Sequence, residues 1–196
     1  MRVGLIIYGD LNTLSGGYLY DRYLVHHLQS QGDEVYIISQ PWQGYGLALL
    51  ENVNIKRIKD LRCLPLDVLL EDELNHPSLF WLNRHLRSRV RYPIISIVHH
   101  LRSSEPYHPH IFRHLYRWIE QAYINSVDGF IFNSRATQQS VYRASRSAQV
   151  KPHCIVYPGG NAHGEGIADL NYLVQRSFQK GPLHILFLGN LIRRKR

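Results

Sequence analysis

Residues 3–39 read VGLIIYGDLNTLSGGYLYDRYLVHHLQSQGDEVYIIS, and this stretch decides the fold. The apolar run from Val3 to Tyr8 is typical of a strand buried on both faces of a parallel sheet. Apolar and aromatic residues then recur at helical spacing until Gly32, which indicates a helix end. A second apolar run covers residues 34–39, so the stretch predicts one strand, helix, strand unit. The helical spacing is read from Tyr20, Tyr23, Leu24, His27 and Leu28.

The rest of the chain repeats this alternation less regularly. Ser134 precedes one of the helical patterns and is a natural N-cap for it. The alternation predicts an α/β fold, a Rossmann-like doubly wound parallel sheet with helices on both faces. The expected strands cover residues 53–58, 68–70, 93–99, 129–133 and 154–157, and the expected helices cover residues 78–88, 111–123 and 136–144.

The glycine-rich stretch 158–166 marks a linker or an exposed loop. A short helical pattern follows, and then a buried run at 183–188 begins a fresh strand-to-loop unit. A parallel strand needs a crossover helix to cover it, so this unit resembles the beginning of a second domain that is cut off. We expect an amino-terminal domain at 1–157, a linker at 158–182, and the start of a further domain at 183–196.

Composition bounds the class of protein. Of the 196 residues, 44% are hydrophobic, which excludes a disordered or fibrous chain. The net charge of +8 favours anionic partners without choosing among them. Cys63 and Cys154 lack metal or redox spacing, so we expect buried thiols in a reducing compartment. Without a signal peptide or a long apolar run, the chain is expected to be cytoplasmic, with peripheral membrane contact left open.

Two features at predicted strand ends are suited to ligand chemistry. Gly16 and Gly17 lie in the expected loop after the first strand, where a backbone without side chains can approach a phosphate at a helix N-terminus. The dinucleotide-binding glycine spacing is absent, and such a pair more often forms just a tight turn. His99 and His100 end a strongly apolar strand, and an imidazole there can accept a hydroxyl proton or bond a hydroxyl. Packing and solvation remain the alternative for both histidines.

Acidic, amide and basic side chains follow other strands. Glu73 belongs to an acidic run that either lines the crevice or is solvated, and Asn133 ends another strand. Arg193, Arg194 and Lys195 follow the strand at 183–188, at a place where a diphosphate would bind. A charged chain end explains these three cations as well.

Together these motifs resemble the amino-terminal half of retaining glycosyltransferases with two Rossmann-like domains, the GT-B fold of the glycosyltransferase family 4-like group. The resemblance implies an acceptor-binding amino-terminal domain and a donor-binding domain that opens near Leu183. The residues that carry it are Gly16-Gly17, Ser96-Ile97-Val98-His99, Phe130-Ile131-Phe132-Asn133-Ser134, Val156-Tyr157-Pro158-Gly159-Gly160-Asn161 and Leu186-Phe187-Leu188-Gly189 with Lys195.

The resemblance also implies a reaction and its residues. A sugar would pass from a nucleoside-diphosphate sugar to a hydroxyl of a saccharide or lipid-linked acceptor, with retention and without a metal or other cofactor. His99 would lie beside the transferred sugar as the catalytic residue. The donor diphosphate would contact Gly16, Gly17, Arg193, Arg194 and Lys195, and the acceptor would contact His100, Glu73 and Asn133.

Because most of a donor domain is missing, we expect the isolated chain to fold but not to turn over donor. The alternative is a non-catalytic basic Rossmann-like module that binds an anionic partner, either membrane lipid or nucleic acid. For the enzyme, no nucleic-acid partner is expected. A nicotinamide-dependent dehydrogenase is disfavoured because the glycine fingerprint is absent.

Overall fold

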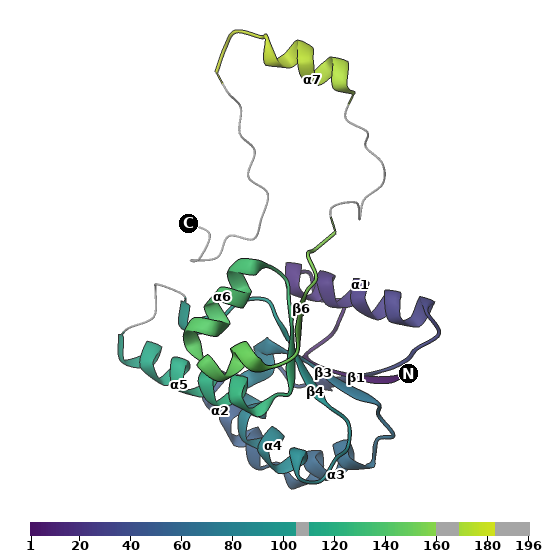
Figure 1. The fold of residues 1–196 in the computed structure, drawn as a ribbon, viewed down its shortest axis with the longest axis vertical. Coiled ribbons are helices and arrows are strands. Elements are labelled where there is room, and N and C mark those ends of the chain that lie inside the picture. The colour runs from purple at the N-terminus through teal and green to yellow at the C-terminus, as the bar shows by residue number, and fades with distance from the viewer. Residues whose placement is uncertain (105–109, 160–168, 183–196) are drawn as a thin grey trace. The chain divides into compact units, whose positions relative to one another are not determined.

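The computed structural model describes residues 1–104, 110–159 and 169–182 (Figure 1). The chain divides into two compact units, Met1–Tyr157 and Pro158–Arg196. The described part of the second unit contains one helix, α7 (Leu170–Ser177), which Asp169 caps by accepting a hydrogen bond from the Asn171 amide. The expected strand at 183–188 and the cations Arg193, Arg194 and Lys195 lie outside the described residues.

The first unit is built on a parallel sheet, which confirms the predicted fold class. The described residues form six strands in the order β2-β1-β3-β4-β5-β6, and every neighbouring pair is parallel. This arrangement is that of a Rossmann-like doubly wound α/β fold. The strands are β1 (Arg2–Tyr8), β2 (Glu34–Gln40), β3 (Val68–Asp72), β4 (Ile94–Val98), β5 (Gly129–Phe132) and β6 (His153–Ile155).

Helices cover both faces of the sheet. On one face, α1 packs Tyr18 and Val25 against Leu5 and Ile97 of the strands. On the other face, four helices build the larger core, and Figure 1 shows α3 and α4 on the opposite side of the strands from α1. Among the described residues, no helix combines the length and apolarity needed to cross a membrane. The helices of this unit are α1 (Gly16–Ser30), α2 (Tyr45–Leu50), α3 (Ile55–Cys63), α4 (His76–Arg87), α5 (His110–Ser126) and α6 (Arg135–Ala144), with 3-10 turns η1 (Glu51–Val53), η2 (Glu73–Asn75), η3 (Arg102–Ser104) and η4 (Arg146–Val150).

The expected strand at 53–58 is wrong, because this segment forms the end of η1 and the start of α3. Asn54 caps α3, and its side chain accepts a hydrogen bond from the Arg57 amide at 3.1 Å. The apolar side chains of Val53 and Ile55 are exposed, so they are not the inward residues of a strand. A capping side chain and a charged helix therefore override a short apolar alternation.

Helix α1 begins earlier than expected. Ser15 caps it by accepting a hydrogen bond from the Tyr18 amide at 3.3 Å, so Gly16 and Gly17 form its first turn rather than a loop. The inward residues are Tyr18, Asp21 and Val25, whereas Tyr23 and His27 of the expected stripe face solvent. The sheet-facing side of α1 thus carries a carboxylate.

Both cysteines also differ from expectation. Cys63 and Cys154 are free thiols, and both are exposed rather than buried. Cys63 is the last residue of α3, where Leu61 supplies the buried contact, and Cys154 lies on the edge strand β6. Neither position gives the thiol a full set of packing neighbours, so the prediction from residue type fails for both.

Candidate functional site

The strand order places the topological switch point of the sheet at the carboxyl ends of β1 and β3. The chain leaves β1 through α1 to reach β2 on one side, while β3 leads through α4 to β4 on the other side. Helices on opposite faces therefore diverge at this point, which is where open α/β sheets bind ligands. The end of β3, the residue after β4 and the first turns of α1 all meet at this edge.

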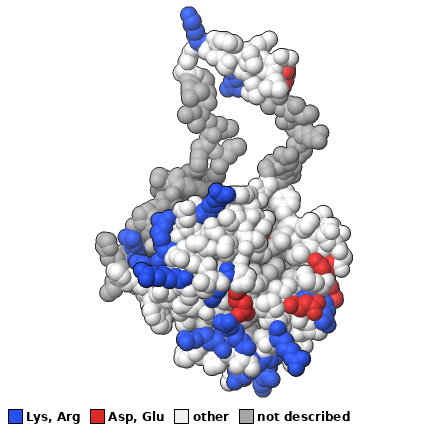
Figure 2. Space-filling model, in the orientation of Figure 1, with Lys and Arg blue, Asp and Glu red and all other residues white. Residues whose placement is uncertain are grey.

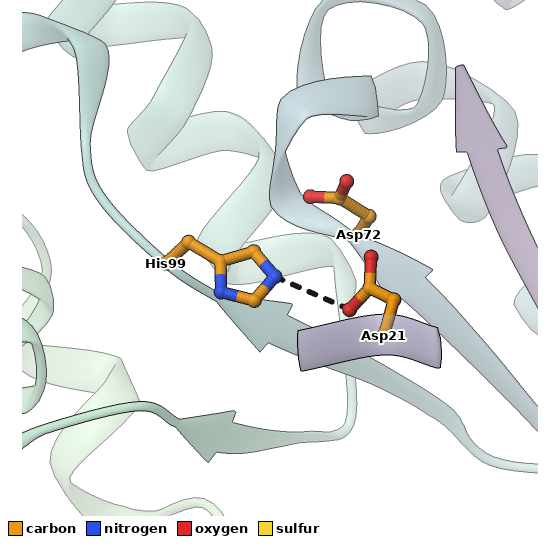
Figure 3. Close-up of side chains that lie close together, drawn as sticks. All are labelled: Asp21, Asp72 and His99. Carbon is orange, nitrogen blue, oxygen red and sulfur yellow. Dashed lines mark hydrogen bonds and ion pairs between the residues drawn. The ribbon is translucent and has the colours of Figure 1, made fainter. Parts of the chain in front are cut away.

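Three side chains converge at this edge, as Figure 3 shows: Asp21 of α1, Asp72 at the end of β3, and His99 after β4. The Nε2 atom of His99 lies 3.2 Å from Oδ1 of Asp21. Both carboxyl groups are fully buried, and 13% of the His99 side chain is exposed. One potential ligand atom from each residue lies within 4.8 Å of the other two. Within the described residues, Oδ2 of Asp21 and Oδ2 of Asp72 have no hydrogen-bond partner.

Burial and neighbouring charges set the protonation of this cluster. Burial, followed by the charge of the nearby Asp21 carboxylate, raises the pKa of Asp72 to about 7, although the charge of His99 opposes the shift. Burial lowers the pKa of His99, but the hydrogen bond to Asp21 and the charges of Asp72 and Asp21 outweigh it, so the net shift is upward. The imidazole therefore favours its charged form beside two buried carboxyl groups.

The first turns of α1 hold the imidazole from one side. A Cβ built on Gly17 would lie 3.5 Å from Cδ2 of His99, an ordinary van der Waals distance, so this position of the helix faces the imidazole ring. Tyr20 approaches the ring edge-on, with 5.1 Å between ring centroids. A Cβ on Gly16 would meet nothing within 4 Å. The two glycines differ, since only Gly17 contacts the histidine.

The backbone of His99 is held by the segment after β5. Asn133 Nδ2 donates to the carbonyl oxygen of His99 at 3.1 Å, and Thr137 Oγ1 donates to Asn133 Oδ1 at 2.6 Å. Ser134 caps α6 as predicted, accepting from the Thr137 amide. Asn133 is named above as a candidate acceptor contact. In this structure its side-chain amide instead binds the backbone of His99.

Glu73 and His100 are joined at the next position along the edge. The Oε2 atom of Glu73 accepts a hydrogen bond from the His100 amide at 3.2 Å. Glu73 is 2% exposed, and burial followed by the charge of Asp72 raises its pKa well above the ordinary value. Glu71 and Asp72 are fully buried as well, so the solvated alternative for this acidic run is wrong.

The described residues contain one group that could hold a metal ion, and it is the Asp21, Asp72 and His99 cluster. Two carboxylates and an imidazole are a donor set that divalent transition metals accept. In this structure, however, Nε2 of His99 is bonded to Asp21 itself, and its positive charge balances a buried carboxylate. We therefore interpret the cluster as a buried ion pair with an adjoining carboxyl group.

Sequence reasoning missed Asp21. The available signal was its spacing, because Tyr18, Asp21 and Val25 stand three and four residues apart and so lie on one helix face. A carboxylate on an inward face requires a partner, and this makes it a candidate functional group. The partner is distant in sequence, so the helical pattern alone does not name it.

Comparison with known proteins finds no family model that matches the chain and no curated protein that matches its sequence. We therefore infer the function from the fold, from the bond between Asp21 and His99, and from the position of these residues at the switch point of the sheet.

Proposed function

We propose that the chain forms the acceptor-binding half of a retaining glycosyltransferase. The enzyme would transfer a sugar from a nucleoside-diphosphate sugar to a hydroxyl of a saccharide or lipid-linked acceptor in the cytoplasm, in peripheral contact with a membrane. The observation that carries this proposal is the buried Asp21 and His99 pair at the switch point of a Rossmann-like sheet, packed against Gly17. The motifs that resemble such enzymes support it.

In this proposal His99 is a hydrogen-bond donor to the transferred sugar. Its Nε2 is bonded to Asp21, which leaves Nδ1 as the ring nitrogen for a substrate. The hydrogen bond to Asp21 raises the pKa of His99 despite burial, which favours the protonated ring, and a protonated ring donates from Nδ1 rather than accepting a proton. The sequence left two roles for His99, accepting a hydroxyl proton and hydrogen-bonding a hydroxyl. Hydrogen bonding to a sugar hydroxyl is therefore favoured over proton abstraction.

The reaction would break the bond between the anomeric carbon and the diphosphate and form one to the acceptor oxygen. The acceptor proton would leave with the departing phosphate. The first turn of α1 offers backbone N–H groups and a positive dipole end to that diphosphate, with no side chain at Gly16 or Gly17 to block it.

The test measures sugar transfer by the full-length protein that contains this chain, over a panel of nucleoside-diphosphate sugars. His99→Ala should lower kcat/KM by about tenfold to a hundredfold, the value of a hydrogen bond to a charged group. The matched control is His27→Ala, an exposed histidine on α1. Absence of transfer with every donor, or unchanged turnover in the His99 variant, would overturn the proposal.

The alternative is a binding module without chemistry, which would make no use of the Asp21 and His99 pair. Titration of the chain with nucleoside diphosphates, lipid vesicles and oligonucleotides at low and high salt separates the two. Strongly salt-dependent binding of oligonucleotides alone would favour the module. Binding of nucleoside diphosphates that His99→Ala weakens would favour the enzyme.

A further inference from the structure

Two adjoining hollows lie between α5 and the segment formed by α6 and η4. One has a volume of about 600 Å³ and the other about 390 Å³, and both are lined by Arg117, Arg143 and Ala144. We call the two hollows together the α5–α6 groove. The described residues that line it also include Ser103, Ser104, Arg113, His114, Gln121, Asn125, Ser140, Ser145, Arg146, Ser147 and Lys151.

The groove is basic along its whole length. Its lining includes four arginines and Lys151, and no acidic side chain is among the described residues that form it. Figure 2 shows blue side chains without red ones over this part of the surface, at the left of the view. Arg113 and Arg117 project from α5, while Arg143 and Arg146 come from α6 and η4. Like charges from two elements therefore meet in one groove.

The arginines of the groove have no counter-ion within the described part of the chain. The ion pairs found there involve Arg2, Arg57 and Arg87 instead. Arg143 uses only its Nε, which donates to the Gln139 carbonyl oxygen at 3.3 Å. Unbalanced like charges repel one another, and an anion in the groove would relieve that repulsion.

Other polar groups shape the floor rather than compete for a ligand. Lys151 Nζ donates to the carbonyl oxygens of Ile124, Asn125 and Val127, so its three donors are used and it contributes charge alone. Ser145 and Ser147 both donate to Asn125 Oδ1, at 2.8 and 2.5 Å. These bonds connect η4 to the end of α5, so the backbone that carries the groove cations is held in place.

We propose that the α5–α6 groove binds phosphate groups. A guanidinium carries a fork of donors that matches phosphate oxygens, and several arginines around one hollow suit a ligand with more than one negative charge. The groove lies outside the Asp21 and His99 cluster, since none of its lining residues belongs to that cluster. This site is therefore independent of the proposed transferase activity.

The phosphate has two possible sources, a phospholipid headgroup or a soluble polyphosphate. The same helix that supplies Arg113 and Arg117 exposes Trp118 at 60% and Leu115 at 45%. An exposed tryptophan on a helix with arginines suits the interface of an anionic membrane, whereas binding of a soluble phosphate does not require an apolar side chain. Trp118 therefore distinguishes the two sources.

The experiment measures binding of the full chain to vesicles of phosphatidylglycerol with phosphatidylcholine, to vesicles of phosphatidylcholine alone, and to pyrophosphate. Arg117→Gln combined with Arg143→Gln should weaken the phosphate-dependent binding about tenfold or more. The matched control removes the same charge elsewhere, by Lys59→Gln combined with Arg62→Gln on the exposed side of α3. Pyrophosphate binding that His99→Ala weakens and the groove variant does not would place that binding at the proposed donor site and overturn the groove.

Each outcome decides the proposal. Vesicle binding that the groove variant and Trp118→Ala both weaken identifies a lipid headgroup, and pyrophosphate binding that only the groove variant weakens identifies a soluble phosphate. Binding to neither ligand overturns the proposal, as does equal weakening by the control pair, since that reflects net charge only. If the double variant does not fold, Arg113→Gln with Arg146→Gln tests the same groove with two other cations.

Discussion

The imidazole of His99 is bonded to the buried carboxylate of Asp21, with 3.2 Å between Nε2 and Oδ1, across 78 residues of sequence. This bond joins the residue after β4 to the sheet-facing side of α1 and fixes the helix relative to the sheet. Because both groups are largely withdrawn from water, loss of one partner leaves the other buried and uncompensated, which costs more than breaking a surface ion pair.

Replacing the carboxylate should change the titration of the histidine. Asp21→Asn keeps the shape of the side chain but removes its charge, so burial is opposed only by Asp72 and the pKa of His99 should fall. An NMR titration of the imidazole C–H resonances measures this directly. Asp60→Asn, on the exposed side of α3, is the control and should leave the His99 curve in place. An unmoved His99 pKa in Asp21→Asn would mean that the pair does not set its protonation.

Buried Glu71 should make the protein less stable as pH rises. Burial raises its pKa to about 8 in the folded state, above the ordinary 4.5, although the hydrogen bond from Asn83 lowers it. Between these pH values the unfolded chain has released a proton that the folded chain keeps, so the free energy of unfolding falls as pH rises through this window. The stabilising contribution is complete below pH 4.5 and is lost as pH passes about 8.

Glu71→Gln removes this titration and keeps an oxygen to accept the bond from Asn83 Nδ2. Urea unfolding measured across the window should therefore show a smaller fall in stability for the variant than for the wild type. Some fall remains because Asp72 and Glu73 also have raised pKa values. Identical pH dependence in the two proteins would contradict the assignment to Glu71.

The strands were predictable where an apolar run is buried from both faces, as in Val3 to Tyr8, because burial there demands apolar residues at every position. The N-cap at Ser134 was predictable for a similarly local reason, since its bond reaches only to Thr137. Contacts between residues that are close in sequence can be predicted from the sequence itself.

The site was harder to predict because its contacts are not local. Asp21 lies on a face of α1 shared with Tyr18 and Val25, but the sheet that it faces brings in His99 and Asp72 from distant strands. The strand predicted at residues 53–58 was wrong for a different reason, since Asn54 caps a helix within a pattern that resembles a short strand. Packing between elements that are distant in sequence decides the first case, and a local helix cap decides the second.

Asn52 lies in η1, directly before residues 53–58, and anchors this part of the chain to α4. Asn52 is 1% exposed, and its Nδ2 donates to the Pro77 carbonyl oxygen at 2.7 Å while its Oδ1 accepts from the Trp81 amide at 2.8 Å. Asn52→Ala removes both bonds that tie η1 to α4 and should lower the free energy of unfolding by about 1–3 kcal/mol. Urea unfolding measures the loss, with the exposed Asn12→Ala as control. Equal loss in both variants would argue against an anchor at Asn52.

Gly129 should be intolerant of any side chain for reasons of space. A Cβ there would lie 2.7 Å from the backbone oxygen of Pro152 and 3.0 Å from Cδ1 of Ile95. The Pro152 oxygen is not free to move, because it accepts a hydrogen bond from the Phe130 amide at 3.0 Å in the pairing of β5 with β6. Gly129→Ala must therefore displace a strand, and it should lower the free energy of unfolding by about 1–3 kcal/mol.

The matched control is Gly16→Ala, because a Cβ at Gly16 meets nothing within 4 Å and the residue begins a helix. That variant should gain about 0.5–1 kcal/mol, since alanine restricts the unfolded chain and favours the helix. Chemical unfolding of both variants against the wild type gives the two signs. If Gly129→Ala were as stable as Gly16→Ala, the close approach of β5 to Pro152 would not limit the residue at this position, and the spacing of the two strands would have to yield at little cost.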